Sequence, residues 1–438
     1  MNTIGVKEPV ILLPKEDIDL NKWAVVACDQ YTGQPEYWRE VEKFVGDAPS
    51  TNNLIFPEVW LGQDDEVRIA RIQKSMRDYL ERGLFKEHKG FILVERSTVT
   101  PHGTRTRMGI MVAADLEHYD YNKGPHSLTR ATEGTILDRI PPRVRIRQGA
   151  PLEVPHIMLL VDDPEHTVIK PITAAKGQLK VLYNTELMMK GGHICGYAVD
   201  AARAARMQEA LAALANPESF RKRYGLTADQ PVLLYAVGDG NHSLATAKAV
   251  WENLKKTLPP AQISEHPARY ALVELVNVHD EGLEFEPIHR VLFNVQGDFL
   301  TSLKETFKDS VSYINCSREL MMARVGGDTT HRIGLITAQG HGILEFARPT
   351  KNLPVATIQE FLDPFMKSGG AHSIDYVHGD DVVCELGARA SNVGLYLPSM
   401  NKDDLFKTVL LDGVLPRKTF SMGEANEKRY YLECRKIL

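Results

Sequence analysis

The residue types best suited to chemistry lie in one glycine-rich hexapeptide, Gly-Asp-Gly-Asn-His-Ser, at positions 238–243. The apolar run 232–237 before it predicts a buried strand, and apolar residues at helical intervals over 244–254 predict a helix after it. At the start of such a helix, unpaired N–H groups and the positive end of the dipole face outward, and glycines let the backbone approach an anion closely. We therefore predict a phosphate-binding turn.

Two side chains of this turn suit phosphoryl chemistry. Asp239 could bind Mg²⁺ or accept a hydroxyl proton, and His242 could donate to phosphoryl oxygens. The alternative interpretation is a simple helix cap, because Asn and Ser are good N-cap residues. The turn is not a Walker loop, since the Gly-x-x-x-x-Gly-Lys-Ser/Thr spacing is absent. The residues expected to contact phosphate are Gly238, Gly240, Asn241 and Ser243.

Several other elements must position this turn. Strands are predicted over 10–13, 23–27, 91–94, 108–114, 156–161, 272–276, 333–336 and 430–434, and helices over 64–83 and 198–215. The strand at 23–27 leads into Asp29 and Tyr31, which we interpret as a substrate loop or as an Asx turn at a strand end. A long loop over 115–130 continues to Glu133, a candidate catalytic residue, and to Asp138 and Arg139.

Three further groups of polar residues have ordinary alternatives. Arg143, Arg145 and Arg147 share one side if their segment is extended, which favours an anion patch or a solvated strand face. His279, Asp280 and His289 could suggest a metal site, but their spacing matches no common zinc pattern. Segment 190–193, Lys-Gly-Gly-His, is interpreted as a turn.

Composition limits the classes of function. The net charge of −5 provides no broad cationic field for nucleic acid or an anionic membrane. The five cysteines are scattered and odd in number, which favours a reduced cytoplasm, and no stretch approaches the ~20 apolar residues of a membrane span. The length predicts two or three folding units, and the change to shorter strands and turns places the boundary between segments 1–258 and 259–438.

Motifs spread along the chain resemble one family. Residues 239–243 resemble the Asp-Gly-His-His-Arg signature of the domain-of-unknown-function family DUF1015 and of archaeal free-serine kinases, which share a ParB/sulfiredoxin-like fold. Segment 415–420 is similar to the family's Met-Pro-x-Lys-Ser-Thr, segment 286–290 to its Pro-Thr-His-Arg, and segment 130–139 to its His-Thr to Asp-Arg loop. These matches occur in order, and the chain is identified as a member of the family.

The resemblance implies a fold and a site. The fold would be mixed α+β, with a ParB/sulfiredoxin-like nucleotide-binding region at 1–258 and a C-terminal α+β lobe that completes the site. ADP or ATP with Mg²⁺ would bind at the turn, where Asp239, Asn241 and His242 border the phosphates and Asp239 is the metal ligand. Lys418 and Thr419 would come from the second lobe. The base that activates the acceptor hydroxyl stays open among Asp29, Glu36 and Glu133.

The sequence departs from the family signature at two positions. Asn241 replaces the first histidine and Ser243 replaces the arginine, so another cation must neutralise phosphate charge. Lys418 and one of Arg143, Arg145 or Arg147 are the candidates. Asn241 also stands where sulfiredoxin has its reactive cysteine, which excludes that sulfur chemistry.

We therefore expect a phosphotransferase, a small-molecule kinase that converts a hydroxylated metabolite, most plausibly free serine to O-phosphoserine. The residues expected to bind the substrate are Asp29, Tyr31, Arg147, His289 and Arg290. The alternatives are a nucleotide-switched binding protein of ParB type and a metal-assisted hydrolase. Turnover separates the three, because only a kinase needs an acceptor. The donor nucleotide and a homodimer stay open.

Overall fold

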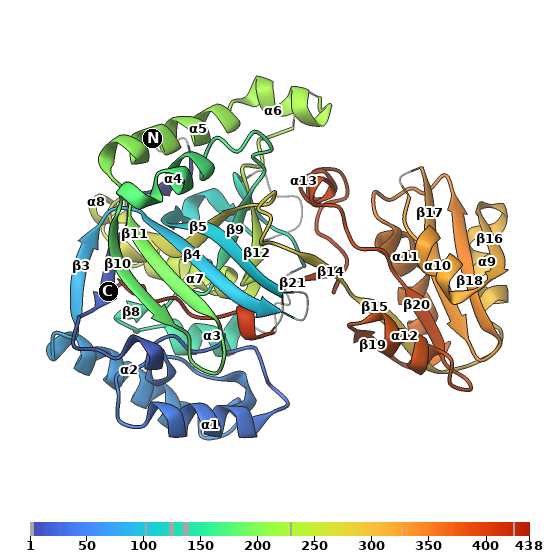
Figure 1. Cartoon of the computed structure of the whole chain (residues 1–438), viewed down its shortest axis with the longest axis horizontal. Helices are drawn as coiled ribbons and strands as arrows, with labels where there is room; N and C mark the ends of the chain where they lie inside the picture. Colours follow the sequence, from blue (N-terminus) through green and yellow to red (C-terminus); the bar gives the residue numbers. More distant parts are fainter. Residues whose placement is uncertain are drawn as a thin grey trace. The chain divides into compact units, whose positions relative to one another are not determined.

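The computed structural model describes residues 4–100, 103–121, 127–134, 140–227, 230–327, 329–423 and 425–438. The chain forms two units (Figure 1). Unit 1 comprises Met1–Leu283 and Gly423–Leu438, and unit 2 comprises Glu284–Met422. Both units combine helices with β-sheet, so the predicted mixed α/β class is confirmed.

The chain leaves unit 1 after Leu283, and not after 258 as the sequence pattern suggested. The reason is strand β13 (Tyr270–Asn277), which is buried at every position and pairs with strands of unit 1 on both sides. The short strands that follow 259 therefore do not begin a new unit. The end of the chain, from Gly423, also returns to unit 1.

Unit 1 is built on a 10-stranded mixed sheet with the order β10-β11-β4-β5-β13-β9-β12-β7-β6, and β1 pairs with β5. Its strands are β1 (Val6–Lys7), β4 (Ile92–Thr100), β5 (Gly103–Asp115), β6 (Tyr119–Asp120), β7 (Thr129–Ala131), β9 (Met158–Val161), β10 (Lys180–Glu186), β11 (His193–Ala198), β12 (Tyr235–Asp239) and β13. Strand β12 runs parallel to β7 and antiparallel to β9. The smaller pairs are β2 (Val10–Pro14) with β3 (Phe85–Lys89), and β8 (Leu152–Glu153) with β22 (Arg435–Lys436).

The helices of unit 1 are α1 (Pro35–Val45), α2 (Asp65–Glu81), α3 (Ile140–Arg147), α4 (Lys170–Ala174), α5 (Ala201–Leu214), α6 (Pro217–Tyr224), α7 (Asn241–Lys255) and α8 (Pro260–Ile263). Figure 1 shows α1 and α2 together on one side of this unit and α5 and α6 on the opposite side. The predicted helices at 64–83 and 198–215 are confirmed as α2 and α5. The segment that carries the three arginines is helix α3 and packs against α7, so the prediction of an extended segment there is wrong.

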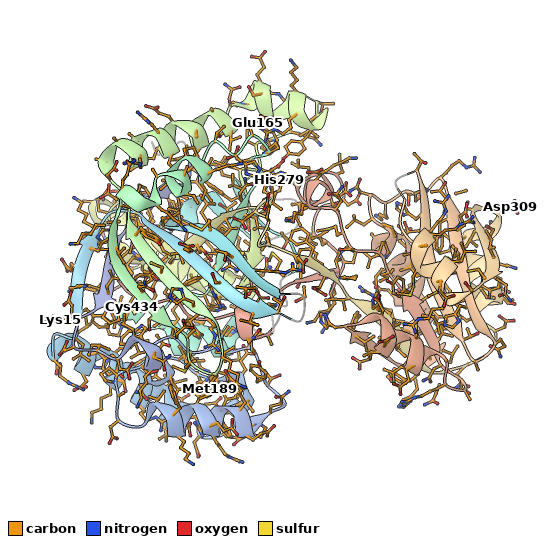
Figure 2. All side chains as sticks on the ribbon, in the orientation of Figure 1. Lys15, Glu165, Met189, His279, Asp309 and Cys434 are labelled. Carbon is orange, nitrogen blue, oxygen red and sulfur yellow. The ribbon has the colours of Figure 1, made fainter. Side chains whose placement is uncertain are left out.

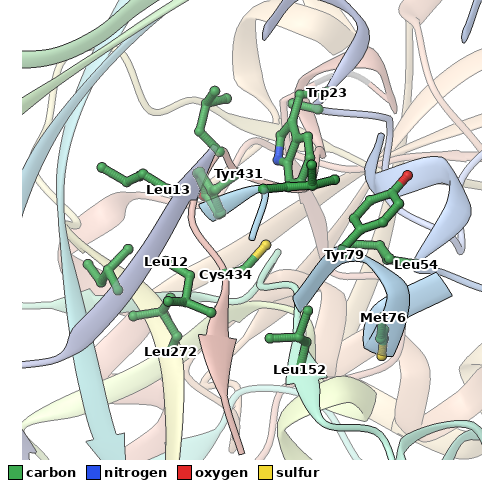
Figure 3. Packing of buried hydrophobic residues seen from close by; sticks show 14 of the residues in the cluster. Leu12, Leu13, Trp23, Leu54, Met76, Tyr79, Leu152, Leu272, Tyr431 and Cys434 are labelled. Atoms are coloured by element: carbon green, nitrogen blue, oxygen red, sulfur yellow. The ribbon is translucent and has the colours of Figure 1, made fainter. Parts of the chain in front are cut away.

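One large apolar core joins the two ends of the chain in unit 1. Trp23 and Tyr79 pack there with Leu272 of the sheet and with Tyr431 and Cys434 near the C-terminus (Figure 3). Figure 2 labels Cys434 among the side chains of the whole chain. The predicted strands at 23–27 and 430–434 are not regular strands. They are held by isolated β-bridges at Val26↔Arg429 and Leu12↔Cys434.

A buried carboxyl group beside this core gives stability a predicted pH dependence. Glu433 is fully buried and accepts a hydrogen bond from the Tyr183 hydroxyl at 2.6 Å. Burial raises the pKa of Glu433 to about 7. Because an unfolded glutamate titrates near ~4.3, the folded state holds the proton more tightly, and the free energy of unfolding should fall as the pH rises from about 4.5 to about 7.

Glu433→Gln removes this titration and should flatten that part of the stability curve. The measurement is the free energy of unfolding in urea between pH 4.5 and 8. Replacement of the exposed Glu40 by Gln is the control and should leave the fall in place. Parallel curves for the wild type and Glu433→Gln would contradict the prediction.

Unit 2 has its own 6-stranded sheet, with the order β16-β18-β17-β20-β15-β19. Its strands are β15 (His289–Val295), β16 (Val311–Cys316), β17 (Thr330–Thr337), β18 (Gly340–Ala347), β19 (Ala371–Val377) and β20 (Val393–Tyr396), and its helices are α9 (Phe299–Phe307), α10 (Arg318–Arg324), α11 (Pro354–Lys367), α12 (Asp380–Gly387) and α13 (Lys402–Leu411). A separate pair, β14 (Phe285–Pro287) with β21 (Phe420–Met422), joins the first and last strands of the unit. Across the described part of the chain, no helix is both long and apolar enough to cross a membrane.

Candidate functional site

The predicted strand-turn-helix is present, and its geometry depends on Gly240. Strand β12 ends at Asp239 and helix α7 begins at Asn241, with Gly240 between them at φ 80°. A Cβ atom on Gly240 would lie 3.0 Å from Cγ1 and 3.2 Å from Cα of Ile157. Since the N-cap residue of α7 is this glycine, no N-cap side chain covers the first N–H groups of the helix. Neither Asn241 nor Ser243 is the N-cap, so the simple helix-cap interpretation does not hold.

The close contact at Gly240 leads to a stability prediction. Gly240→Ala should cost about 2–3 kcal/mol, because a left-handed residue with a Cβ costs about 1–2 kcal/mol and the contact with Ile157 adds to it. Gly225 offers a matched control, since it has φ 63° and a Cβ added there would meet no atom within 4 Å. Gly225→Ala should cost about 1 kcal/mol. Equal costs in urea unfolding would show that Ile157 does not restrict the turn.

Asn241 fastens the turn to a neighbouring segment. Its side-chain oxygen accepts from the Thr132 N–H, and its amide nitrogen donates to the Thr132 hydroxyl, both at 3.3 Å. The Thr132 hydroxyl donates in turn to the Val237 carbonyl at 2.6 Å. These bonds hold the segment after β7 against the end of β12. They bring Glu133, the residue after Thr132, to the turn, and they engage the Asn241 side chain that was predicted to contact phosphate.

A histidine lies behind the first turn of helix α7. The Ser243 hydroxyl lies 2.8 Å from Nε2 of His156, which is buried next to Tyr430 with 5.1 Å between ring centroids. Nδ1 of His156 has no hydrogen-bond partner among the described residues. Sequence reasoning treated His156 only as part of a strand. Its contact with Ser243 places this imidazole beside the position at which the family signature has an arginine.

Lys428 is the main functional candidate that the sequence did not reveal. The carboxylate of Asp239 contributes most to raising the pKa of Lys428 above its usual value, and Asp29 and Glu133 raise it further. Three acidic residues from separate segments of unit 1 therefore act electrostatically on one ammonium group. The backbone fixes its position, because the Ala27 N–H donates to the Lys428 carbonyl at 2.7 Å.

Asp29 and Tyr31 also lie in this region. Desolvation raises the pKa of Asp29, but His156, a hydrogen bond from Gln30 and Lys428 outweigh it, and the pKa lies below its usual value. Tyr31 has φ 50°, and its ring stacks on Tyr37 with 4.1 Å between centroids. The substrate loop predicted at Asp29 thus adjoins the glycine turn, and its role in binding a substrate stays a prediction.

The three arginines of α3 do not form an anion patch. Arg143 bonds Glu58, Arg145 pairs with Asp65 and Glu66, and Arg147 bonds the buried Glu153. In a helix Arg145 points away from Arg143 and Arg147, which are four residues apart. Each guanidinium meets a carboxylate of a different segment. The substrate role predicted for Arg147 therefore has no support in this geometry.

His289 and Arg290 belong to the interior of unit 2. Both are fully buried in β15. Nδ1 of His289 accepts from the Leu397 N–H at 3.0 Å, its ring stacks on Tyr396, and burial lowers its pKa to about 4. Arg290 donates to the Arg417 carbonyl at 3.0 Å. These contacts fit a structural role, and the predicted role in substrate binding is not supported, because neither side chain reaches the surface.

The remaining predicted residues are placed as follows. Lys418 is exposed, with φ 58°, and Thr419 is buried and donates to the Pro416 carbonyl at 2.7 Å. Both lie in unit 2, and their part in a nucleotide site stays a prediction. Asp138 and Arg139 lie outside the described residues. Within the described ranges, no three His, Cys, Asp or Glu side chains form a group that could hold a metal ion, and this includes His279, Asp280 and His289.

The site thus defines a class: a mixed α/β protein with a glycine turn, several carboxylates and a lysine gathered at one helix N-terminus. The family model described as "Protein of unknown function (DUF1015)" matches residues 12–365. The chain therefore belongs to this family, and the family resemblance found in the motifs is confirmed.

Several solved structures are similar at low identity. A free serine kinase in complex with ADP has a TM-score of 0.37 and 10% identity over 73% of this chain and 90% of that chain. SbnI with a C-terminal truncation, from Staphylococcus aureus, has a TM-score of 0.34 and 10% identity over 72% of this chain and 82% of that chain. A conserved hypothetical protein from Pyrococcus furiosus has a TM-score of 0.32 and 10% identity, with coverages of 72% and 90%. No curated protein matches the chain.

Proposed function

We propose that this chain is a nucleotide-dependent phosphotransferase that uses ADP or ATP to phosphorylate a small hydroxylated metabolite, with free serine as the favoured acceptor. The observation that carries the proposal is that Asp239, just before the start of helix α7, acts together with Asp29 and Glu133 on the ammonium group of Lys428 and raises its pKa. Phosphoryl transfer requires mainly positioning and charge neutralisation, and these groups supply both.

The chain offers a separate group for each part of the reaction. The backbone around Gly240 and the start of α7 would hold phosphate oxygens, and Lys428 would neutralise the charge that moves with the phosphoryl group. Lys428 takes the role that the family signature gives to arginine at position 243. One of Asp29, Asp239 and Glu133 would accept the proton of the acceptor hydroxyl.

The donor set also fits Mg²⁺. This ion commonly uses one or two carboxylates together with substrate phosphates, and it rarely has a complete protein cage. Asp239 with Asp29 or Glu133 would supply the carboxylates. The Mg²⁺ ion would bring positive charge to a region where carboxylates outnumber the one lysine.

The test is incubation of the full chain with Mg²⁺, ADP or ATP, and a pool of small hydroxyl compounds, followed by mass detection of phosphorylated products. A product that appears only with an acceptor, and most strongly with serine, would support the kinase. Nucleotide consumption without an acceptor would indicate a hydrolase. Binding without turnover would indicate a nucleotide-switched protein, and either of these results would overturn the proposal.

A further inference from the structure

A cavity lies between helices α1 and α2, which Figure 1 shows together on one side of unit 1. Its volume of about 160 Å³ far exceeds the ~10–15 Å³ that a single water needs, so it has room for an organic molecule. None of its lining residues belongs to the glycine turn or to the segments that carry Asp29, Glu133 and Lys428. The α1–α2 cavity is therefore separate from the candidate site described above.

Part of the cavity lining is apolar and buried. Val45 of α1, Ile72 of α2 and, between the two helices, Ile55 and Phe56 all line the cavity and all have buried side chains. The same four residues belong to the two hydrophobic clusters of this part of unit 1. The apolar part of the lining is thus held in place by the core. A ligand that fills the cavity must present apolar surface to it.

One face of α2 brings two arginines to the cavity. Arg68, Arg71, Ile72 and Ser75 line it at spacings i, i+3, i+4 and i+7, which share one side of a helix. Nε of Arg68 donates to a backbone carbonyl at 3.1 Å, and its guanidinium lies 5.3 Å from the ring centroid of Trp60. Its Nη atoms and the whole Arg71 guanidinium have no hydrogen-bond or ion-pair partner among the described residues. These two side chains therefore keep donors available.

Two further donors belong to residues of the same lining. Nε1 of Trp60 is buried and has no hydrogen-bond partner among the described residues. The side-chain amide of Asn52 also has no partner within the described ranges. Native proteins seldom leave a buried polar atom unpaired, and such an atom calls for a ligand or water. The unpaired donors of the lining favour a ligand that accepts hydrogen bonds.

The charge of the lining selects among acceptors. Its charged residues are Arg68, Arg71 and Glu42, so the lining carries a net positive charge although the whole chain carries −5. Glu42 is exposed and keeps contact with water. Two guanidiniums and one carboxylate balance a single negative charge. A doubly charged phosphate would exceed that balance and would leave the apolar part of the lining unfilled.

We propose that the α1–α2 cavity binds a small monocarboxylate with a compact apolar body. Its carboxylate would accept from Arg71 and from the Nη atoms of Arg68, because a guanidinium fork matches a carboxylate. Its apolar body would lie against Val45, Phe56 and Ile72. A neutral apolar compound would leave the guanidiniums without an acceptor, and a purely polar anion would leave the apolar residues uncovered. The proposal does not rest on phosphotransfer.

Binding is tested by calorimetry on the full chain without nucleotide, with four probes. Benzoate and 3-methylbutanoate carry both a carboxylate and an apolar body, acetate lacks the body, and benzamide lacks the charge. The first two should bind, and acetate and benzamide should bind at least tenfold more weakly. Absence of binding by both carboxylates with an apolar body would overturn the proposal. Equal binding of acetate or of benzamide would overturn it as well.

Trp60 reports where the probe binds. It is partly exposed and lines the cavity, whereas the other three tryptophans of the chain, Trp23, Trp38 and Trp251, are fully buried. Acrylamide should therefore quench mainly the fluorescence of Trp60. Saturation with 3-methylbutanoate, which does not absorb in this range, should reduce that quenching. Binding with unchanged quenching would place the carboxylate elsewhere and overturn the proposal.

Arg71→Gln tests the carboxylate contact. It should weaken benzoate binding at least tenfold and leave the melting temperature of the ligand-free protein unchanged, because Arg71 is exposed and has no ion pair among the described residues. Arg77→Gln, on an exposed arginine of α2 outside the lining, is the matched control and should bind normally. Equal affinities of the two variants would overturn the proposal.

Lys428→Met separates this cavity from the glycine turn. It should bind benzoate and 3-methylbutanoate as the wild type does, whatever happens to its nucleotide affinity. Failure of the proposed kinase and failure of this inference are thus distinguishable, because nucleotide and carboxylate are titrated independently. A loss of carboxylate binding in Lys428→Met, with normal binding in Arg71→Gln, would show that the probes occupy the glycine turn and would overturn the proposal.

Discussion

Replacing Lys428 with methionine should weaken nucleotide binding about 10- to 150-fold, which corresponds to the roughly 1.5–3 kcal/mol of a hydrogen bond to a charged group. The loss follows from the surroundings of the ammonium group, because Asp239, Asp29 and Glu133 would then repel the phosphates without compensation. Methionine keeps much of the length of the lysine side chain and removes its charge. The measurement is calorimetric titration of the variant with ADP and with ATP in the presence of Mg²⁺.

Lys418→Met is the matched control for this substitution. Lys418 is the cation that the family resemblance assigns to the phosphates, and it is exposed in unit 2. A loss in both variants would mean that the two lysines contribute together. A loss in Lys418→Met alone, with unchanged affinity in Lys428→Met, would contradict the site proposed at the helix N-terminus.

The glycine turn could be predicted because its determinants are local. A buried strand, a glycine with φ 80° and an amphipathic helix follow one another within residues 232–254. The periods of the two elements are readable in any short window. Asp239 and His242 were therefore placed at the strand-to-helix junction from the sequence alone, although the structure has Asp239 at the end of β12 and His242 in the first turn of α7.

Lys428 could not be found in this way, because its position depends on a pairing between the two ends of the chain. The bridge between Val26 and Arg429 brings segment 425–430 beside the N-terminal loop, and no local pattern specifies that partner. One signal was present: Lys428 and Arg429 directly precede two tyrosines that turn out to be buried. Cations next to buried aromatic residues suggest charges that are held in the protein and not at a free surface.

The arginine segment shows the opposite error, in which a local pattern was available and was misread. Arginines at alternate positions suggest a strand face, but Pro141 and Pro142 lie just before them and suit the first turn of a helix. The helix formed, and each arginine paired with its own acidic partner. The substrate role predicted for His289 and Arg290 lacks support for another reason: both residues are buried, and a motif match carries no information on burial.

Asp239→Asn should reduce turnover about 10²- to 10⁴-fold, the usual contribution of a group that transfers a proton. The fold should remain intact, because Oδ1 of Asp239 accepts the Gly240 N–H at 3.0 Å and the side-chain oxygen of asparagine can accept the same bond. The charge is lost, however, and with it the main group that raises the pKa of Lys428. Initial rates of product formation and the melting temperature, measured side by side, separate these effects.

Asp17→Asn, on an exposed aspartate of the same unit, controls for the loss of one negative charge and should leave the rate unchanged. Comparing nucleotide affinity with and without Mg²⁺ then identifies which role Asp239 plays. If it is a metal ligand, Asp239→Asn should lose the part of the affinity that depends on Mg²⁺. If it is the base, affinity should survive while the rate falls. Full activity in Asp239→Asn would exclude both roles and leave Asp29 and Glu133 as the carboxylates that act on the acceptor hydroxyl.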